Sequence, residues 1–144
     1  MAESAYNVSQ GSEMMETVHK EVMFCGLGNH QVIIEDIIRD LELEPYAFDI
    51  RLILMEAVTN AYYHGNHSDC TKPITIRYFL CGGLLNLQVE DSGDGERNLL
   101  IPQEIGDGEL LEDGGRGLYL IRCFSDSVEM IRNTMFISKN VCAH

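Results

Sequence analysis

A glycine-rich run that contains one arginine, Gly114-Gly115-Arg116-Gly117, precedes an apolar pattern of helical spacing that begins at Leu118. The first N–H groups of a helix have no partner within the helix, and glycines expose still more of the backbone. Such a helix start binds anions, and Arg116 adds positive charge to it. The residue types and their spacing therefore predict a phosphate-binding site at Gly114 to Leu118.

Asp91, Gly93 and Gly95 form a D-x-G-x-G motif at the end of a predicted strand. This placement puts a carboxylate at the edge of a sheet, and the two glycines let the backbone turn sharply and approach a ligand closely. An acidic turn or a calcium loop is the alternative. Calcium is disfavoured because the twelfth position, which is a glutamate in EF-hand loops, would here be Pro102.

Glu56, Asn60 and His64 recur at intervals of four residues, so a helix would carry them along one side. Gly65 follows at once and is expected to end the helix with a positive φ. A glutamate and an asparagine on a helix flank belong more often to a solvated surface than to a site. The helix is predicted to pack inward because apolar residues recur at helical spacing, namely Ile50, Ile53, Leu54, Ala57, Val58 and Ala61.

Short strands and amphipathic helices must position these residues. The Gly26–Asn29 stretch is interpreted as a turn, because its lone G-x-G lacks the further residues of a nucleotide motif. Residues 96–112 lack a pattern and are interpreted as a lid. Helices are predicted over 32–41, before Pro45, from about 47 to 65 and from 118. Strands are predicted at 19–25, 74–80, 85–89, 128–132 and 135–139.

The composition indicates one folded, soluble domain. With 144 residues and 45% hydrophobic content the chain can bury a core. Its 10 basic and 23 acidic residues give a net charge of −13, which argues against nucleic acid or membrane as a partner because such a surface repels phosphates. The five cysteines lack CxxC spacing, and no signal peptide or membrane-spanning run is found, so we expect a cytoplasmic location. We expect a flexible segment at 1–17 and a single domain at 18–144.

Three motifs occur in order along the chain, namely Glu56-x-x-x-Asn60-x-x-x-His64-Gly65, Asp91-x-Gly93-x-Gly95 and Gly114-Gly115-Arg116-Gly117-Leu118. Together they resemble the N, G1 and G2 boxes of the GHKL (Bergerat-fold) ATPases, the superfamily of histidine kinases, gyrase-type topoisomerases and anti-sigma-factor kinases. The Asn60–Gly65 sequence, the third box and a freestanding domain of this length are most similar to the anti-sigma-factor serine/threonine kinase branch. The resemblance covers about residues 18–139. It implies an α+β fold, a two-layer α/β sandwich with a mixed, mostly antiparallel sheet and helices on one face.

The resemblance also implies roles for the polar residues. Asn60 would bind Mg²⁺ through its carboxamide oxygen, with ATP phosphates and waters as the other ligands. Glu56 would be the general base, one helical turn from Asn60. Asp91 would accept a hydrogen bond from the adenine amino group. Gly93 and Gly95 would let the backbone close on the base.

The third box, Gly114 to Leu118, would hold the phosphates. Arg116 would either contact a phosphate or organise the lid, and His64 would either approach the phosphates or cap the helix. Thr134 falls where the family often has a Gly-Thr pair, from which this chain departs because the preceding residue is Asn133.

The implied function is that of an ATP-dependent kinase that phosphorylates serine or threonine of an anti-anti-sigma (STAS-type) protein and sequesters a sigma factor. Two alternatives stay open. One is a non-catalytic nucleotide-binding module, against which Glu56 argues. The other is a detached histidine-kinase ATPase domain, against which the lack of a recognisable phosphoacceptor hairpin argues.

Assembly is the last expectation. The resembled branch forms homodimers that bind one sigma factor, and the strand around Lys20 to Phe24 is expected to be a sheet edge open to a second copy. The acidic charge is expected to attract a basic region of the sigma factor, in a salt-dependent way. Acidity that serves solubility alone is the alternative.

Overall fold

The computed structural model describes residues 4–8, 18–95 and 115–142, and within them six strands form one sheet in the order β1-β2-β3-β4-β6-β5. The strands are β1 (Ser4–Val8), β2 (Val18–Cys25), β3 (Pro73–Cys81), β4 (Leu84–Glu90), β5 (Ser127–Ile131) and β6 (Thr134–Asn140). The α-helices are α1 (His30–Leu41), α2 (Ala47–Asn60) and α3 (Gly115–Phe124). Every ladder between these strands is antiparallel.

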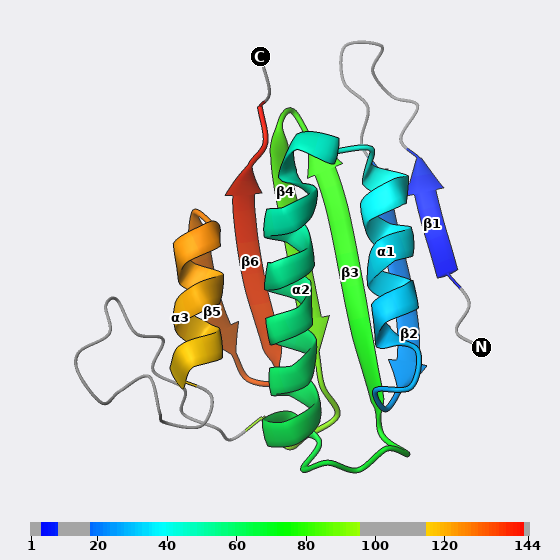
Figure 1. The fold of residues 1–144 in the computed structure, drawn as a ribbon. Helices are drawn as coiled ribbons and strands as arrows, with labels where there is room; N and C mark the ends of the chain where they lie inside the picture. Colours follow the sequence, from blue (N-terminus) through cyan, green and yellow to red (C-terminus); the bar gives the residue numbers. More distant parts are fainter. Residues whose placement is uncertain (1–3, 9–17, 96–114, 143–144) are drawn as a thin grey trace.

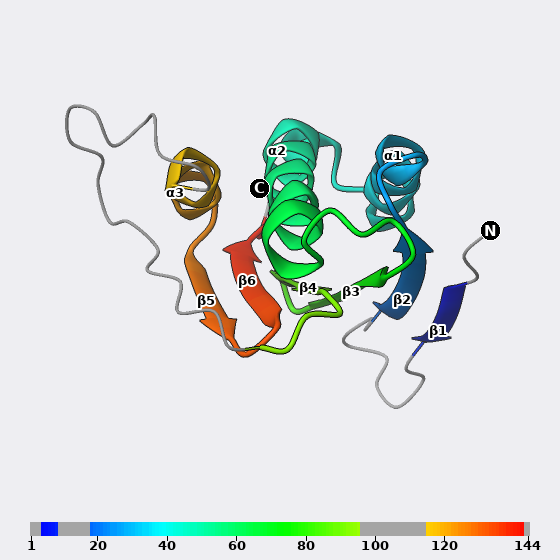
Figure 2. The same ribbon diagram turned by 90° about the horizontal axis from the view of Figure 1, so that it is seen from below.

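The molecule has two layers, with α1, α2 and α3 side by side on one face of the sheet (Figure 2). The predicted α+β sandwich with helices on one face is thereby confirmed. The helices of the described ranges all fall short of the length and apolar character that a membrane span requires.

The core lies between the two layers. Alternate residues of the central strands point toward the helices, so Ile76 pairs with Val89 and Tyr78 pairs with Leu87, and all four side chains are buried. From the helical layer, α2 contributes fully buried residues along its apolar seam: Ile50, Ile53, Leu54, Ala57 and Val58. The predicted core face of this helix is therefore present.

The first helix ends before the proline that was expected to break it. Glu42 adopts the left-handed conformation, with φ 56°, and its N–H bonds the carbonyls of Ile38 and Arg39. Pro45 lies in the first turn of the short 3₁₀-helix Glu44–Tyr46. A proline there loses no helical hydrogen bond, so it helps to begin the next helical segment.

The second helix does not stop at Asn60 but continues as a π-helix over Ala61–Gly65. Its hydrogen bond runs from the N–H of Asn66 to the carbonyl of Ala61, five residues back, at 2.8 Å. The helical segment ends at Gly65, as predicted, but the expected positive φ at Gly65 is wrong. The left-handed residues come later, at His67 (φ 54°) and Ser68 (φ 62°).

The N-terminal part of the chain differs from two expectations. Residues Ser4–Val8, to which no regular structure was assigned, form β1 and pair with β2. Strand β2 is therefore no open edge, and the expectation that it could pair with a second copy is wrong (Figure 1). The reason is local, since an antiparallel partner from the chain itself already takes up the hydrogen-bonding groups of β2.

Candidate functional site

A pocket of about 200 Å³ lies between the last turns of α2, the π-helix and the start of α3. Helix α3 runs antiparallel to α2 (Figure 1), so its first turn lies beside the C-terminal half of α2. The pocket is lined by Glu56, Thr59, Asn60, Tyr63, His64 and Gly117. Four of these are predicted site residues, and they come from two motifs that are well separated in the sequence, the first ending at Gly65 and the second beginning at Gly114.

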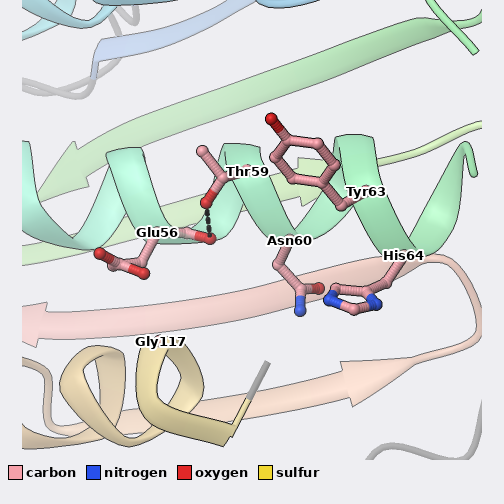
Figure 3. Close-up of a pocket in the computed structure, with 6 residues that line it drawn as sticks. All are labelled: Glu56, Thr59, Asn60, Tyr63, His64 and Gly117. Carbon is pink, nitrogen blue, oxygen red and sulfur yellow. Dashed lines mark hydrogen bonds between the residues drawn. The ribbon is translucent and has the colours of Figure 1, made fainter. Parts of the chain in front are cut away.

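Glu56 and Gly117 approach each other closely across this pocket. A Cβ placed on Gly117 would lie 2.5 Å from Oε1 of Glu56, so the carboxylate occupies the space that any other residue at 117 would need. The glycine thus exposes backbone at the start of α3, and it also makes room for Glu56. The Thr59 hydroxyl donates to the carbonyl of Glu56 at 3.1 Å (Figure 3).

Asn60 and His64 both point toward α3 (Figure 3). Asn60 is 93% buried, with 7% of its surface exposed. His64 belongs to the π-helix that continues α2, and it lines the pocket together with Asn60.

The C-terminal end of α3 is fastened to the rest of the fold by Lys139 of β6. Its ammonium group donates to the carbonyl of Phe124 at 2.8 Å and forms an ion pair with Asp49 of α2 at 3.1 Å. A cation at a helix C-terminus is favourable because unpaired carbonyls gather there. Lys139 thereby fixes α3 against α2, which keeps Gly117 opposite Glu56.

Asp91 lies at the end of β4 and packs against the end of the π-helix. A Cβ on Gly65 would lie 2.0 Å from Oδ2 of Asp91, and one on Gly93 would lie 2.5 Å from the carbonyl oxygen of Gly65. Gly65 is therefore required by this close packing, which is why its φ need not be positive. The N–H of Gly93 donates to Oδ1 of Asp91 at 2.8 Å. Asp91 is almost fully buried.

Two asparagines that the sequence analysis missed hold this turn in place. Asn66, which is fully buried, accepts a hydrogen bond from the N–H of Ser92 at 2.7 Å and donates to the carbonyl of Lys72 at 3.1 Å. The side-chain amide of Asn133 donates to the carbonyl of Asp91 at 2.7 Å, and its backbone carbonyl accepts from the N–H of Asp91 at 2.9 Å. The only available signal was position, because Asn66 follows the first motif and Asn133 lies in the turn before β6.

The other predicted site residues have varied surroundings. Gly95 has φ 77°, and a Cβ there would lie 3.3 Å from the Cβ of Arg132. Thr134 is buried at the start of β6, opposite Glu90.

At the start of α3, Leu118 is a core residue, so only its backbone remains available to a ligand, whereas Arg116 is exposed. Gly115 is the first residue of α3, whereas Gly114 and all of the predicted lid at 96–112 lie outside the described residues.

The donors around Asn60 fit a magnesium ion that a nucleotide brings with it. No cluster of three or more His, Cys, Asp and Glu side chains that could hold a metal occurs in residues 4–8, 18–95 and 115–142. Asn60 would supply one carboxamide oxygen to such an ion. Mg²⁺ in nucleotide sites takes few protein ligands and completes its shell with phosphate oxygens and water.

Comparisons with known proteins agree with this arrangement. The family model of the histidine kinase-like ATPase domain matches residues 27–136. A protein named anti-sigma F factor from Clostridium perfringens is 36% identical over 84 residues. Proteins named serine-protein kinase RsbW are 30% identical over 88 residues in Listeria monocytogenes and in Listeria innocua.

These matches cover part of each protein. They span 57% of this chain, 60% of the Clostridium protein and 56% of the Listeria proteins. The family match contains Glu56, Asn60, Asp91 and Gly117 and is the more extensive of the two kinds of similarity.

Proposed function

This chain belongs to the histidine kinase-like ATPase domain family, and on that premise we propose that it is an anti-sigma-factor kinase. In this proposal it transfers phosphate from ATP to a serine or threonine of an anti-anti-sigma (STAS-type) protein and binds a sigma factor. Membership of an ATPase family makes ATP the expected nucleotide. The names of the relatives, anti-sigma F factor and serine-protein kinase RsbW, support the two parts of the activity.

The observation that carries the proposal is the position of the Glu56 carboxylate. It lies against Gly117 at the start of α3, where anionic groups are expected to bind, and one helical turn from Asn60. A carboxylate in such a place would repel phosphates and would be a poor choice in a site that only binds them. It is well placed to remove a proton from a hydroxyl group.

The proposed reaction is a phosphoryl transfer. The acceptor oxygen forms a bond to the γ-phosphorus, the bond from that phosphorus to the bridging oxygen breaks, and ADP leaves with the electron pair. Glu56 accepts the proton of the acceptor hydroxyl. Bound Mg²⁺ would neutralise charge on the phosphate oxygens, and Asn60 is the residue that would hold it. Asp91 would select adenine, and the backbone of Gly115 to Leu118 would hold the phosphates.

The sigma-factor part of the proposal is supported by charge. A net charge of −13 favours a basic partner surface and disfavours direct contact with nucleic acid. A homodimer remains part of the proposal through family resemblance alone, because β1 covers the edge of β2 that had suggested it.

The test of the kinase proposal compares wild type with Glu56→Ala. Each protein is incubated with Mg²⁺-ATP and each STAS-type protein of the same genome, and phosphate on the acceptor is followed by intact-protein mass spectrometry. We expect Glu56→Ala to keep nucleotide affinity within a few-fold, by calorimetry, and to lower transfer by about 10²–10⁴. Asn60→Ala serves as the comparison, since it should lose Mg²⁺-dependent binding as well. Nucleotide binding by wild type without transfer to any of these proteins would instead indicate a regulatory binding module.

A further inference from the structure

Two residues that line the pocket have no part in the roles given so far. Thr59 and Tyr63 point away from α3, whereas Asn60 and His64 point toward it (Figure 3). The pocket therefore has a side at α3, where phosphates are expected, and a second side formed by Thr59 and Tyr63.

Phosphoryl transfer explains why a second side is needed. The attacking and leaving oxygens lie roughly in line on opposite sides of the γ-phosphorus. If ADP leaves on the side of α3, the acceptor hydroxyl has to arrive from the opposite side of the γ-phosphorus. Thr59 and Tyr63 line that side of the pocket, and Glu56 lines the same pocket from the side of α3.

Tyr63 has the properties of a residue that binds a protein segment. Tyr63 is 52% exposed and lines the pocket. It is nevertheless held in position, because its ring makes an edge-to-face contact with Tyr62, with centroids 4.9 Å apart. The Tyr62 hydroxyl donates in turn to the carbonyl of Ser68 at 3.0 Å. An aromatic side chain that is ordered before binding loses little entropy on binding, which is typical of interface hot spots.

Thr59 contributes to this side differently. Its hydroxyl already donates to the carbonyl of Glu56. The Thr59 hydroxyl is therefore already paired, so Thr59 presents a less polar surface next to Tyr63 than a free hydroxyl would. Together with the Tyr63 ring, this surface suits the backbone and apolar parts of a peptide segment.

We propose that Tyr63 binds the segment of the protein substrate that carries the acceptor serine or threonine, and that it thereby directs the acceptor hydroxyl to Glu56. The inference rests on the proposed kinase function and assigns the substrate side of the same pocket. Tyr63 takes no proton. The transfer step is the one described under the proposed function: the acceptor oxygen bonds to the γ-phosphorus, ADP leaves, and Glu56 takes the proton of the acceptor hydroxyl.

The experiment compares transfer to protein with transfer to water. Wild type, Tyr63→Ala, Tyr63→Phe and Val32→Ala are each assayed with Mg²⁺-ATP and the STAS-type protein that wild type phosphorylates. Val32 is the control because its side chain is similarly exposed, at 61%, but lies on α1 away from the pocket. Thermal unfolding of each variant establishes that it is folded.

For Tyr63→Ala we expect the KM for the protein substrate to rise about tenfold or more. The dissociation constant for ATP and the rate of ATP hydrolysis without protein substrate should stay within about twofold, because water needs no docking surface. Tyr63→Phe keeps the ring and should retain most of the affinity, and Val32→Ala should match wild type.

The outcomes separate the two proposals. An unchanged KM in Tyr63→Ala, with transfer by wild type intact, overturns the role of Tyr63 and leaves the kinase function standing. An equal loss of hydrolysis and transfer also overturns it, since the residue would then act on the nucleotide. If wild type phosphorylates no STAS-type protein, the kinase function fails and this inference fails with it.

Discussion

At the scale of single residues, the site depends on one carboxylate and one missing side chain. Glu56 comes from the middle of α2 and Gly117 from the first turn of α3, and the glycine leaves the space that the carboxylate fills. A glycine within a helix is less favourable than alanine by about 0.5–1 kcal/mol. Its presence at this position therefore indicates a requirement of the site that outweighs helix stability.

Gly117→Ala is expected to separate activity from stability. The added methyl group would force the Glu56 carboxylate aside, and a displacement of this kind costs about 10²-fold in rate. Helix propensity would at the same time leave the melting temperature unchanged or raise it. Phosphate transfer at saturating ATP and thermal unfolding measure the two effects. Gly28→Ala is the matched control, because a Cβ there meets nothing within 4 Å; full activity in Gly117→Ala would show that Glu56 has room to move.

At the scale of elements, the π-helix Ala61–Gly65 joins the two halves of the site. Its start follows Asn60, and its end packs on Asp91. Asn66, the next residue, binds the backbone of both the D-x-G-x-G turn and the start of β3 through its amide. The position of Asp91 relative to Asn60 therefore depends on this buried side chain, because it ties the end of the helix to the end of the strand.

Asn66→Ala should destabilise the protein and weaken nucleotide binding together. The N–H of Ser92 and the carbonyl of Lys72 would lose their partner, and a buried polar group left unpaired costs about 1–3 kcal/mol. Urea unfolding and calorimetry with ADP provide the two measurements. Asn86→Ala, on the face of the sheet without helices, should change the free energy of unfolding by less than about 0.5 kcal/mol. Unaltered stability in Asn66→Ala would contradict the role assigned to the amide.

At the scale of the whole molecule, a charged group joins the helical layer to the sheet away from the site. Asp40 of α1 accepts a hydrogen bond from the hydroxyl of Tyr78 of β3 at 3.0 Å and forms an ion pair with Lys20 of β2 at 2.6 Å. Burial and the adjacent Asp40 charge raise the pKa of Tyr78 well above its ordinary value of 10.0.

This raised pKa predicts a loss of stability in alkali. Below pH about 10 the phenol is protonated in both states. Above that pH the unfolded chain releases the proton while the folded chain retains it, so the free energy of unfolding falls as pH rises toward the raised pKa. Urea unfolding from about pH 8 to about pH 11 should show a steeper decline for wild type than for Tyr78→Phe. Parallel declines would show that Tyr78 does not contribute, since both proteins keep the other tyrosines.

The sequence by itself determined the parts of this protein that depend on local pattern. The 3.6-residue period of the α2 seam and the alternation in β3 and β4 predicted the buried faces, because an apolar stripe or alternating row has to face the core. The order of the three motifs indicated the family, and the match over residues 27–136 agrees.

Tertiary structure decided what depends on contacts between segments distant in the sequence. Gly65 was expected to supply a positive φ, whereas the approach of Asp91 from another element is what excludes a side chain there. Local pattern likewise gives no signature for the pairing of β1 with β2, for the hydrogen bonds of Asn66 or for the place of Tyr63 in the pocket lining. The local hydrophobic period predicts which face of a helix or strand is buried. Which other element packs against that face is determined only by the tertiary structure.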